Sequence, residues 1–415
     1  MSMLPINRVV LCALLLFIVA GHSSSSAQEG AATDVEQAAA AAELDPSQAV
    51  ISSDEYRQAV AALESSHGAY ANQLPEYLLS LGLSLQTSGD HEGAIDAFKR
   101  GVHLARINDG LYSAQQIPLL QREMASHMAL GQYAEADERQ LYLYRVQMRS
   151  MESGLTRAQA FIQQAIWQHN AFLLALDGQG YARLMSMWDL YRLSLTDIID
   201  REGSTSLLLK EPLEGMLLAQ YLIANYDVEK INGGGDTFSM QQQMARFSAY
   251  RGQSYQKGQA VIQAIYDVEA ANYGVNSEGT VRARVMLGDW VFWFGDREAA
   301  MNAYSEAIAE LVARGDAELE LASMFDEPVE LPNLEGARQL PPTAEPERAN
   351  LLLEFGVNQR GKVYDLERVD ESELNDAKAN RIMRSLRKTQ FRPRLAMGEP
   401  QDTENVTRAY EIKQQ

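Results

Sequence analysis

A spacing of small and aromatic residues recurs in two distant parts of the chain, and it constrains the fold more than any other feature. One copy contains Leu81, Gly82, Gly89, Ala94, Phe98 and Gly101, and the other contains Leu287, Gly288, Gly295, Ala300, Tyr304 and Ala307. Counted from the first glycine, the later positions fall at +7, +12, +16 and +19 in both copies. This spacing predicts a helical hairpin. The first glycine lets the partner helix approach, the second ends the first helix at positive φ, and the alanine and aromatic residue fill the contact.

These hairpins resemble the tetratricopeptide repeat (TPR) family, with two good copies at about residues 75–108 and 281–314. A degenerate copy at about 117–150 carries Met124 where a small residue is expected and Gln140 where an aromatic is expected. The resemblance implies a superhelix of stacked hairpins whose surface binds other proteins.

The helical period continues between the repeats and extends the predicted helical-repeat domain over residues 51–325. Further helices are predicted at 157–176, 181–200, 211–226 and 239–272, as diverged repeats of the same superhelix. An enzymatic function would need a polar pocket among residues 155–280, which the sequence does not reveal.

A proline-rich segment at residues 326–346 separates this domain from the C-terminal region. It contains five of the twelve prolines of the chain, namely Pro328, Pro332, Pro341, Pro342 and Pro346. We predict a semi-rigid linker there, because clustered prolines favour extended backbone.

The hydrophobic period changes from about 3.6 to 2 after the linker, which predicts a different domain at residues 347–415. Leu351, Leu353, Phe355 and Val357 alternate with other residues, and a turn at 358–361 leads to a second strand at 362–370. A helix at 375–389 follows, with an apolar stripe made of Ala379, Ile382, Met383 and Leu386. The sequence Phe391-Arg392-Pro393, a turn at 398–400 and a last strand at 404–412 complete the region.

The order and spacing of these elements resemble the C-terminal domain of TonB, the energy transducer of Gram-negative bacteria. The resemblance implies a small α+β domain with β-β-α-β order, so the whole chain is expected to be mainly α with this domain at its end. It also implies a free edge on the last strand, where a peptide from an outer-membrane receptor adds as a further strand. The proposed edge consists of Val406, Thr407, Arg408, Ala409, Tyr410, Glu411 and Ile412.

The N-terminus has the pattern of a signal peptide over residues 1–27. Arg8 precedes twelve uncharged residues, and Ser25 and Ala27 have the spacing of a cleavage site before Gln28. Twelve residues span about 18 Å as a helix, less than the roughly 30 Å of a bilayer core. Residues 28–50 are expected to form an Ala-rich low-complexity spacer, and an uncleaved membrane anchor remains the alternative.

Charge and composition exclude several classes of function. The net charge is −20. Residues 347–415 carry 13 Lys/Arg and 12 Asp/Glu, and Arg8 adds one positive charge, so residues 28–346 carry −22. Such a body would repel nucleic acid. The one cysteine, Cys12, lies in the signal segment, and the six histidines form no metal motif. We therefore predict no catalytic, cofactor or metal site. The strongest polar cluster is a basic run that could bind the acidic body or an acidic partner, made of Arg381, Arg384, Arg387, Lys388, Arg392 and Arg394.

These features predict a non-enzymatic periplasmic scaffold or adaptor that binds envelope proteins, among them outer-membrane TonB-dependent receptors. A membrane-anchored transducer for transport through those receptors is the alternative, and it would face the periplasm from the inner membrane. That alternative requires an uncleaved N-terminus, and only then is contact with a membrane expected. An enzyme with a site in residues 155–280 is the third hypothesis.

Overall fold

The structure is a computed structural model that divides into two units, residues 1–176 and 177–415. It describes residues 52–176, 180–227, 238–315, 318–338, 342–343, 347, 349–370, 376–396 and 398–412. The predicted signal peptide and spacer lie outside the described residues. Each unit is considered by itself.

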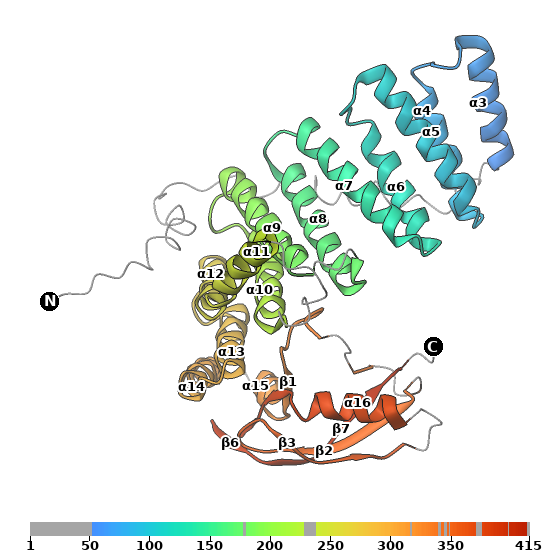
Figure 1. Cartoon of the computed structure of the whole chain (residues 1–415). Coiled ribbons are helices and arrows are strands. Elements are labelled where there is room, and N and C mark those ends of the chain that lie inside the picture. The colour runs from blue at the N-terminus through green and yellow to red at the C-terminus, as the bar shows by residue number, and fades with distance from the viewer. Residues whose placement is uncertain are drawn as a thin grey trace. The chain divides into compact units, whose positions relative to one another are not determined.

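The first unit consists of helices that follow one another as antiparallel hairpins (Figure 1). They are α3 (Ser53–His67), α4 (Leu74–Thr87), α5 (His91–Asp109), α6 (Gln116–Ala129), α7 (Tyr133–Ser150) and α8 (Leu155–Leu173). The hairpins α4–α5 and α6–α7 match the predicted repeats at 75–108 and 117–150, and they give the unit a TPR-like fold.

Local sequence signals fix the ends of these helices. Ser52 and Glu55 form a capping box at the start of α3, and the Asp90 carboxylate accepts a hydrogen bond from the Gly93 N–H at the start of α5. Gly89 and Gly131 end the first helix of their hairpins with φ of 84° and 70°, a conformation that other residues rarely adopt.

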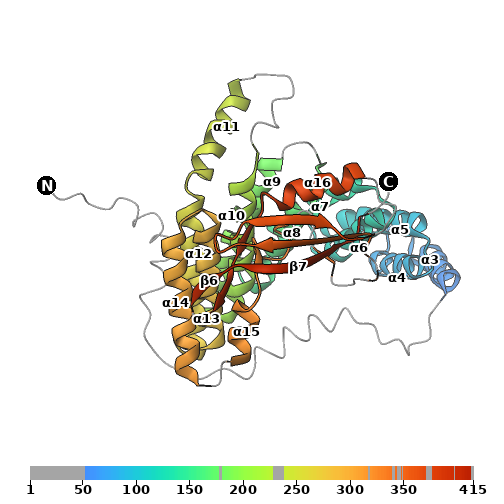
Figure 2. The same cartoon turned by 90° about the horizontal axis from the view of Figure 1, so that it is seen from below.

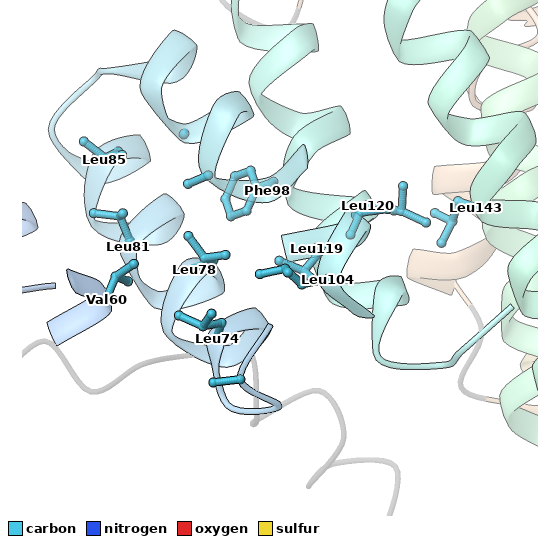
Figure 3. Close-up of a cluster of buried hydrophobic side chains, with 14 of the residues drawn as sticks. Val60, Leu74, Leu78, Leu81, Leu85, Phe98, Leu104, Leu119, Leu120 and Leu143 are labelled. Carbon is cyan, nitrogen blue, oxygen red and sulfur yellow. The ribbon is translucent and has the colours of Figure 1, made fainter. Parts of the chain in front are cut away.

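The contact predicted between the two helices of a repeat is present in α4 and α5. The Phe98 ring lies directly over Gly82, so that a Cβ at Gly82 would meet the ring. Phe98 is fully buried, and the surrounding leucines continue the same core toward α6 and α7 (Figure 3). The Phe98 ring therefore fills the space that the side chain of a larger residue at position 82 would need.

The degenerate repeat replaces this contact with a polar one. Met124, in the place of the glycine, packs against Ala136 and Trp167, while Gln140 is buried in the place of the aromatic ring. The Gln140 amide donates to the Gln164 side chain on α8. The missing ring is thus replaced by a hydrogen bond from the buried amide nitrogen of Gln140 to the next helix.

The helices of the second unit are α9 (Gly180–Glu202), the 3-10 turn η3 (Leu207–Leu209), α10 (Lys210–Asn225), α11 (Phe238–Arg251), α12 (Ser254–Tyr273), α13 (Glu278–Trp293), α14 (Arg297–Arg314) and α15 (Glu318–Phe325). The hairpin α13–α14 matches the predicted repeat at 281–314, with the Tyr304 ring over Gly288.

The prediction of one helix over 239–272 was wrong, because the chain turns at Gly252 and Gln253 between α11 and α12. Glycine is a poor helix former, and the turn frees Phe247 to pack against Tyr181 and Tyr226.

The C-terminal region forms a three-stranded antiparallel sheet in the order β3-β2-β7. Its elements are β2 (Leu351–Val357), β3 (Val363–Arg368), α16 (Asp376–Leu386), β4 (Gln390–Arg392), β5 (Arg394–Ala396), β6 (Glu399–Gln401) and β7 (Thr403–Tyr410). The predicted apolar stripe of α16 packs on the buried side chains of β2. Figures 1 and 2 show α16 on one face of the sheet, while among the described residues no helix of this unit covers the other.

The segment predicted as a linker contains ordered structure. Its strand β1 (Val329–Leu331) pairs with β4 of the C-terminal domain, with Glu330 opposite Phe391. The Arg338 side chain donates to the carbonyls of Glu330 and Pro332, and so holds the chain beyond β1 against that strand. Residues 329–338 are therefore part of the packed second unit and do not form a free spacer.

Within the described part of the chain, we find no helix that combines the length and the apolar character of a bilayer span.

The ring-over-glycine contact makes a specific prediction about Gly288. We expect Gly288→Ala to lower the free energy of unfolding by roughly 1–3 kcal/mol, because its Cβ would overlap the Tyr304 ring. The steric cost of the overlap should exceed the gain in helix propensity from glycine to alanine, which stabilises the variant by about 1 kcal/mol. Urea denaturation of both proteins measures the difference.

Gly252→Ala is the matched control, since a Cβ at Gly252 makes only ordinary contact with backbone oxygens. Its free energy of unfolding should change by about 0.5 kcal/mol or less. Equal stability of Gly288→Ala and the wild type would refute the close contact between α13 and α14.

Candidate protein-binding surfaces

The proposed docking strand is an edge strand of the sheet, since β7 pairs with β2 on one side and no strand pairs with its other side among the described residues. The carbonyl of Tyr410 accepts from the Asn350 N–H at 3.0 Å, on the side of β2. The carbonyl of Ala409 points away from β2. Because alternate residues of a strand direct their backbone groups to the same side, Thr407 and Ala409 present theirs to the free edge.

The side chains of β7 divide between the core and the surface. Val406 and Tyr410 are buried in the core under α16, whereas Thr407 is exposed. Glu411 and Ile412 lie beyond the end of the strand, and the Ile412 N–H donates to the Asn350 side chain. The binding capacity of this edge therefore resides in its backbone groups.

The chain itself already occupies part of the free edge. The Thr343 N–H donates to the Ala409 carbonyl at 2.8 Å, and the Arg408 guanidinium donates to the Pro328 carbonyl at 3.3 Å. Burial raises the pKa of the Glu330 carboxyl, while Arg338 and Arg408 nearby act in the opposite direction. The backbone at Pro328 and Thr343 thus contacts the C-terminal end of β7, and the middle of the edge, around Thr407, remains exposed.

The basic run does not form one continuous surface. Five of its members are exposed, namely Arg381, Arg384, Arg387, Lys388 and Arg394. Arg392 is only 3% exposed and was wrongly assigned to this surface. It points instead to the helical part of the same unit.

Arg392 forms a buried ion pair with Asp289 of α13. Its Nη1 lies 2.9 and 3.0 Å from the two Asp289 carboxylate oxygens. The Tyr304 hydroxyl donates to the same carboxylate at 2.8 Å. The guanidinium carbon also lies 5.8 and 5.5 Å from the ring centres of Tyr304 and Phe325. One contact of the predicted kind, between the acidic body and the basic run, is therefore present.

Burial dominates the electrostatics of this network. It raises the pKa of the Asp289 carboxyl above its ordinary value, although Arg392 and the Tyr304 hydroxyl both favour the charged form. Burial and the Asp289 charge raise the pKa of the Tyr304 phenol well above its ordinary value. Tyr304 therefore stays protonated and serves as a permanent donor to Asp289.

Two further contacts hold the C-terminal domain on the helices. The turn at 358–361 has Gly361 at a φ of 67°, where a Cβ would meet the Phe391 carbonyl and the Phe292 ring. The Arg297 guanidinium donates to the Arg360 carbonyl at 3.0 Å. With the β1–β4 pairing, these contacts make α13, α14 and the C-terminal domain one packed assembly.

A cavity of about 470 Å³ lies beside this junction. Leu217 and Tyr221 of the region 155–280 line it, together with Asp289, Arg392 and Ser323. Of its three charged groups, Asp289 and Arg392 neutralise each other and Arg282 pairs with Glu278, while the Ser323 hydroxyl donates to the Glu320 carbonyl. Among the residues that the structure describes, no group of three or more His, Cys, Asp or Glu is arranged to hold a metal ion. The cavity thus presents no nucleophile paired with a base.

Asp289 and Tyr304 are functional parts of the junction that the sequence analysis did not assign. A signal for Asp289 does exist, because it is the only charged residue between Val285 and Phe294. A single carboxylate within such an apolar stretch is buried on folding and needs a partner. The identity of that partner, 103 residues away, is not encoded locally.

Comparisons with known proteins give one similarity in fold. No protein-family model matches the chain, and no curated protein matches it. Among solved structures, the chain is similar to the crystal structure of a putative kinesin light chain with nearly identical TPR-like repeats from Podospora anserina. The identity is 12% and the TM-score 0.34, over 59% of this chain and 99% of the other.

The buried ion pair predicts a large effect of removing one partner. We expect Arg392→Met to lower the free energy of unfolding of the second unit by about 3–5 kcal/mol at neutral pH, because Asp289 would be left charged and unpaired. Arg394→Met, which changes an exposed arginine of the same segment, is the matched control and should have little effect.

The deficit should depend on pH. An Asp whose pKa is raised by folding loses stability as the pH rises from its unfolded to its folded value. Without Arg392 the folded pKa of Asp289 rises further, so the deficit should be largest at neutral pH and should shrink as the pH falls. Denaturation curves at several pH values would measure this, and a deficit that grows toward acid pH would contradict it.

Proposed function

We propose that this chain is an exported, periplasmic scaffold that joins two binding partners. Its TPR-like hairpins bind one envelope protein, and its C-terminal domain binds another by adding a strand to the outer edge of β7. The observation that carries the proposal is the outward orientation of the backbone groups of Thr407 and Ala409 on an edge strand.

The order of elements in the C-terminal domain supports a TonB-like assignment. Two paired strands, β2 and β3, precede a helix that packs on their apolar face, and the last strand pairs with β2 at the edge of the sheet. In that family the edge binds a peptide of an outer-membrane receptor, so TonB-dependent receptors are the partners we propose for this domain. An extended peptide would pair first with Thr407 and would displace Thr343 to reach Ala409.

The packing of the C-terminal domain favours a scaffold over an energy transducer. A transducer transmits force across the periplasm through a long extended segment. Here the Asp289–Arg392 ion pair attaches the domain to α13, and β4 pairs with β1 in the segment that follows α15. Residues 329–338 therefore do not form a free linker between α15 and the C-terminal domain.

Export predicts a defined mature N-terminus. When the full chain is produced in a Gram-negative host, N-terminal sequencing should find Gln28 as the first residue, and the protein should fractionate with the periplasm. Cleavage is expected because the uncharged segment is shorter than a membrane span. A protein that retains Met1 and sediments with the inner membrane would instead favour the transducer.

Strand addition predicts a strong effect of proline at Thr407. Thr407→Pro removes an outward N–H and should abolish capture of purified TonB-dependent receptors, while the pairing of β7 with β2 is retained. Thr407→Ala keeps the N–H and is the matched control, so it should bind as the wild type does. The measurement is a pull-down with immobilised full chain, with circular dichroism to verify folding.

Two outcomes would contradict this proposal. Receptor capture that survives Thr407→Pro in a folded protein would exclude strand addition at this edge. Failure of the wild-type chain to bind any of a panel of purified receptors would reject the receptor as partner.

A further inference from the structure

Positive charge is concentrated in the C-terminal halves of α5 and α7, in a chain whose net charge is −20. Residues 99–108 and 139–150 contain no Asp or Glu. They contain six Lys or Arg residues, namely Lys99, Arg100, Arg106, Arg139, Arg145 and Arg149. The helix dipole favours cations in a last turn, which accounts for the positions of Arg106 and Arg149 but not for the others.

Some of these cations already serve the fold. Arg100 forms an ion pair with Glu64, and Arg139 pairs with the fully buried carboxylate of Glu123 at 2.9 Å. Arg145 is exposed and has no ion pair with any residue that the structure describes. Arg139 is therefore structural, whereas Arg145 is available to a ligand.

Two other arginines lie over tyrosine rings and leave their guanidinium groups without a carboxylate partner among the described residues. The Arg106 guanidinium lies 5.9 Å from the ring centre of Tyr142, and that of Arg149 lies 5.8 Å from the ring centre of Tyr112. The Tyr142 hydroxyl donates to the Gln116 side chain at 2.8 Å, which fixes the ring. An arginine stacked on a fixed ring loses little conformational freedom when it binds an anion.

Arg106, Tyr142 and Arg145 line a pocket of about 180 Å³ between α5 and α7. Leu141, which is 49% exposed, forms part of its apolar wall. The pocket is lined by Val102, Arg106, Glu138, Arg139, Leu141, Tyr142 and Arg145. Its lining thus combines an apolar wall and Glu138 with two arginines, Arg106 and Arg145, that have no carboxylate partner among the described residues.

We propose that this arginine–tyrosine patch, made of Arg106, Tyr112, Tyr142, Arg145 and Arg149, binds an acidic peptide segment of a partner protein. A carboxylate of the peptide lies between Arg106 and Arg145, and a neighbouring apolar side chain packs on Leu141. Charge complementarity selects this occupant, because guanidinium groups pair with carboxylates through two parallel hydrogen bonds. A nucleic acid is disfavoured, since the acidic chain around the patch repels a long polyanion.

This inference rests on the proposed function, in which the helical hairpins bind a partner, and gives that partner its chemistry. It is independent of strand addition at β7, because all of its residues lie in the first unit. Tyrosine and arginine are also the residue types that most often dominate the energy of a protein interface.

The test uses the full chain and a fluorescent ten-residue peptide with four glutamates and two leucines, followed by fluorescence anisotropy. Arg106→Gln combined with Arg145→Gln should weaken binding about tenfold or more, as expected for the loss of charge-assisted hydrogen bonds. Arg57→Gln is the matched control, since Arg57 is an exposed helical arginine of the same unit on α3. Higher salt should also weaken binding of the wild type, because it screens exposed charges.

Three results would overturn the proposal. The double variant could bind the peptide as tightly as the wild type while circular dichroism shows it folded. A peptide with glutamine in place of every glutamate could bind equally well. The wild type could form a dimer that the double variant does not form, in which case the occupant is a second copy of this chain. Peptide binding at the patch should be unchanged in Thr407→Pro. The results can therefore reject strand addition at β7 and acidic-peptide binding at the patch independently of each other.

Discussion

The contact of an aromatic ring with a glycine on the neighbouring helix sets the spacing of four pairs of helices in this chain. It joins Phe98 to Gly82, Tyr304 to Gly288, Tyr191 to Gly215 and Trp290 to Gly258, and in each pair a Cβ on the glycine would meet the ring. Helices whose facing residue lacks a side chain pack closely, and the ring fills the remaining space at high density. The contact thus explains how helix pairs that differ widely in sequence adopt the same close packing within each unit.

The junction with the C-terminal domain depends on the contact between Tyr304 and Gly288. Tyr304 is held over Gly288, and from there its hydroxyl donates to the next residue, Asp289. A buried carboxylate with one hydrogen bond still carries an uncompensated charge, which Arg392 neutralises. Separation of the C-terminal domain from the helices would leave both Asp289 and Arg392 without their ion-pair partner. The same tyrosine therefore sets the spacing of α13 and α14 and completes the network that holds the C-terminal domain on them.

Features that depend on neighbours in sequence could be predicted, and features that depend on distant partners could not. The three hairpins, the turn at 358–361 and the stripe of α16 follow from short-range spacing, and the structure confirms them. The prolines of 326–346 indicate extended backbone but do not reveal that β1 pairs with a strand some sixty residues later. In the basic run, Arg392 looks like its neighbours, and only its partner on α13 makes it buried. The exposed Arg145 is equally inconspicuous, because the charges around it are distributed over two helices.

The two proposed surfaces use different physics, and this difference gives a scaffold separable functions. The β7 edge offers backbone groups, which pair with an extended segment of almost any sequence, so its selectivity must come from side chains nearby and from access past Thr343. The arginine–tyrosine patch instead offers charged side chains on fixed rings, whose attraction for an acidic segment is selective and is weakened by salt. In an acidic chain, repulsion of most anions leaves a local basic patch as the place where an acidic segment can approach. In the proposed scaffold, the β7 edge accepts many sequences and the patch selects an acidic segment. The two surfaces would therefore bind different proteins and would not compete for the same partner.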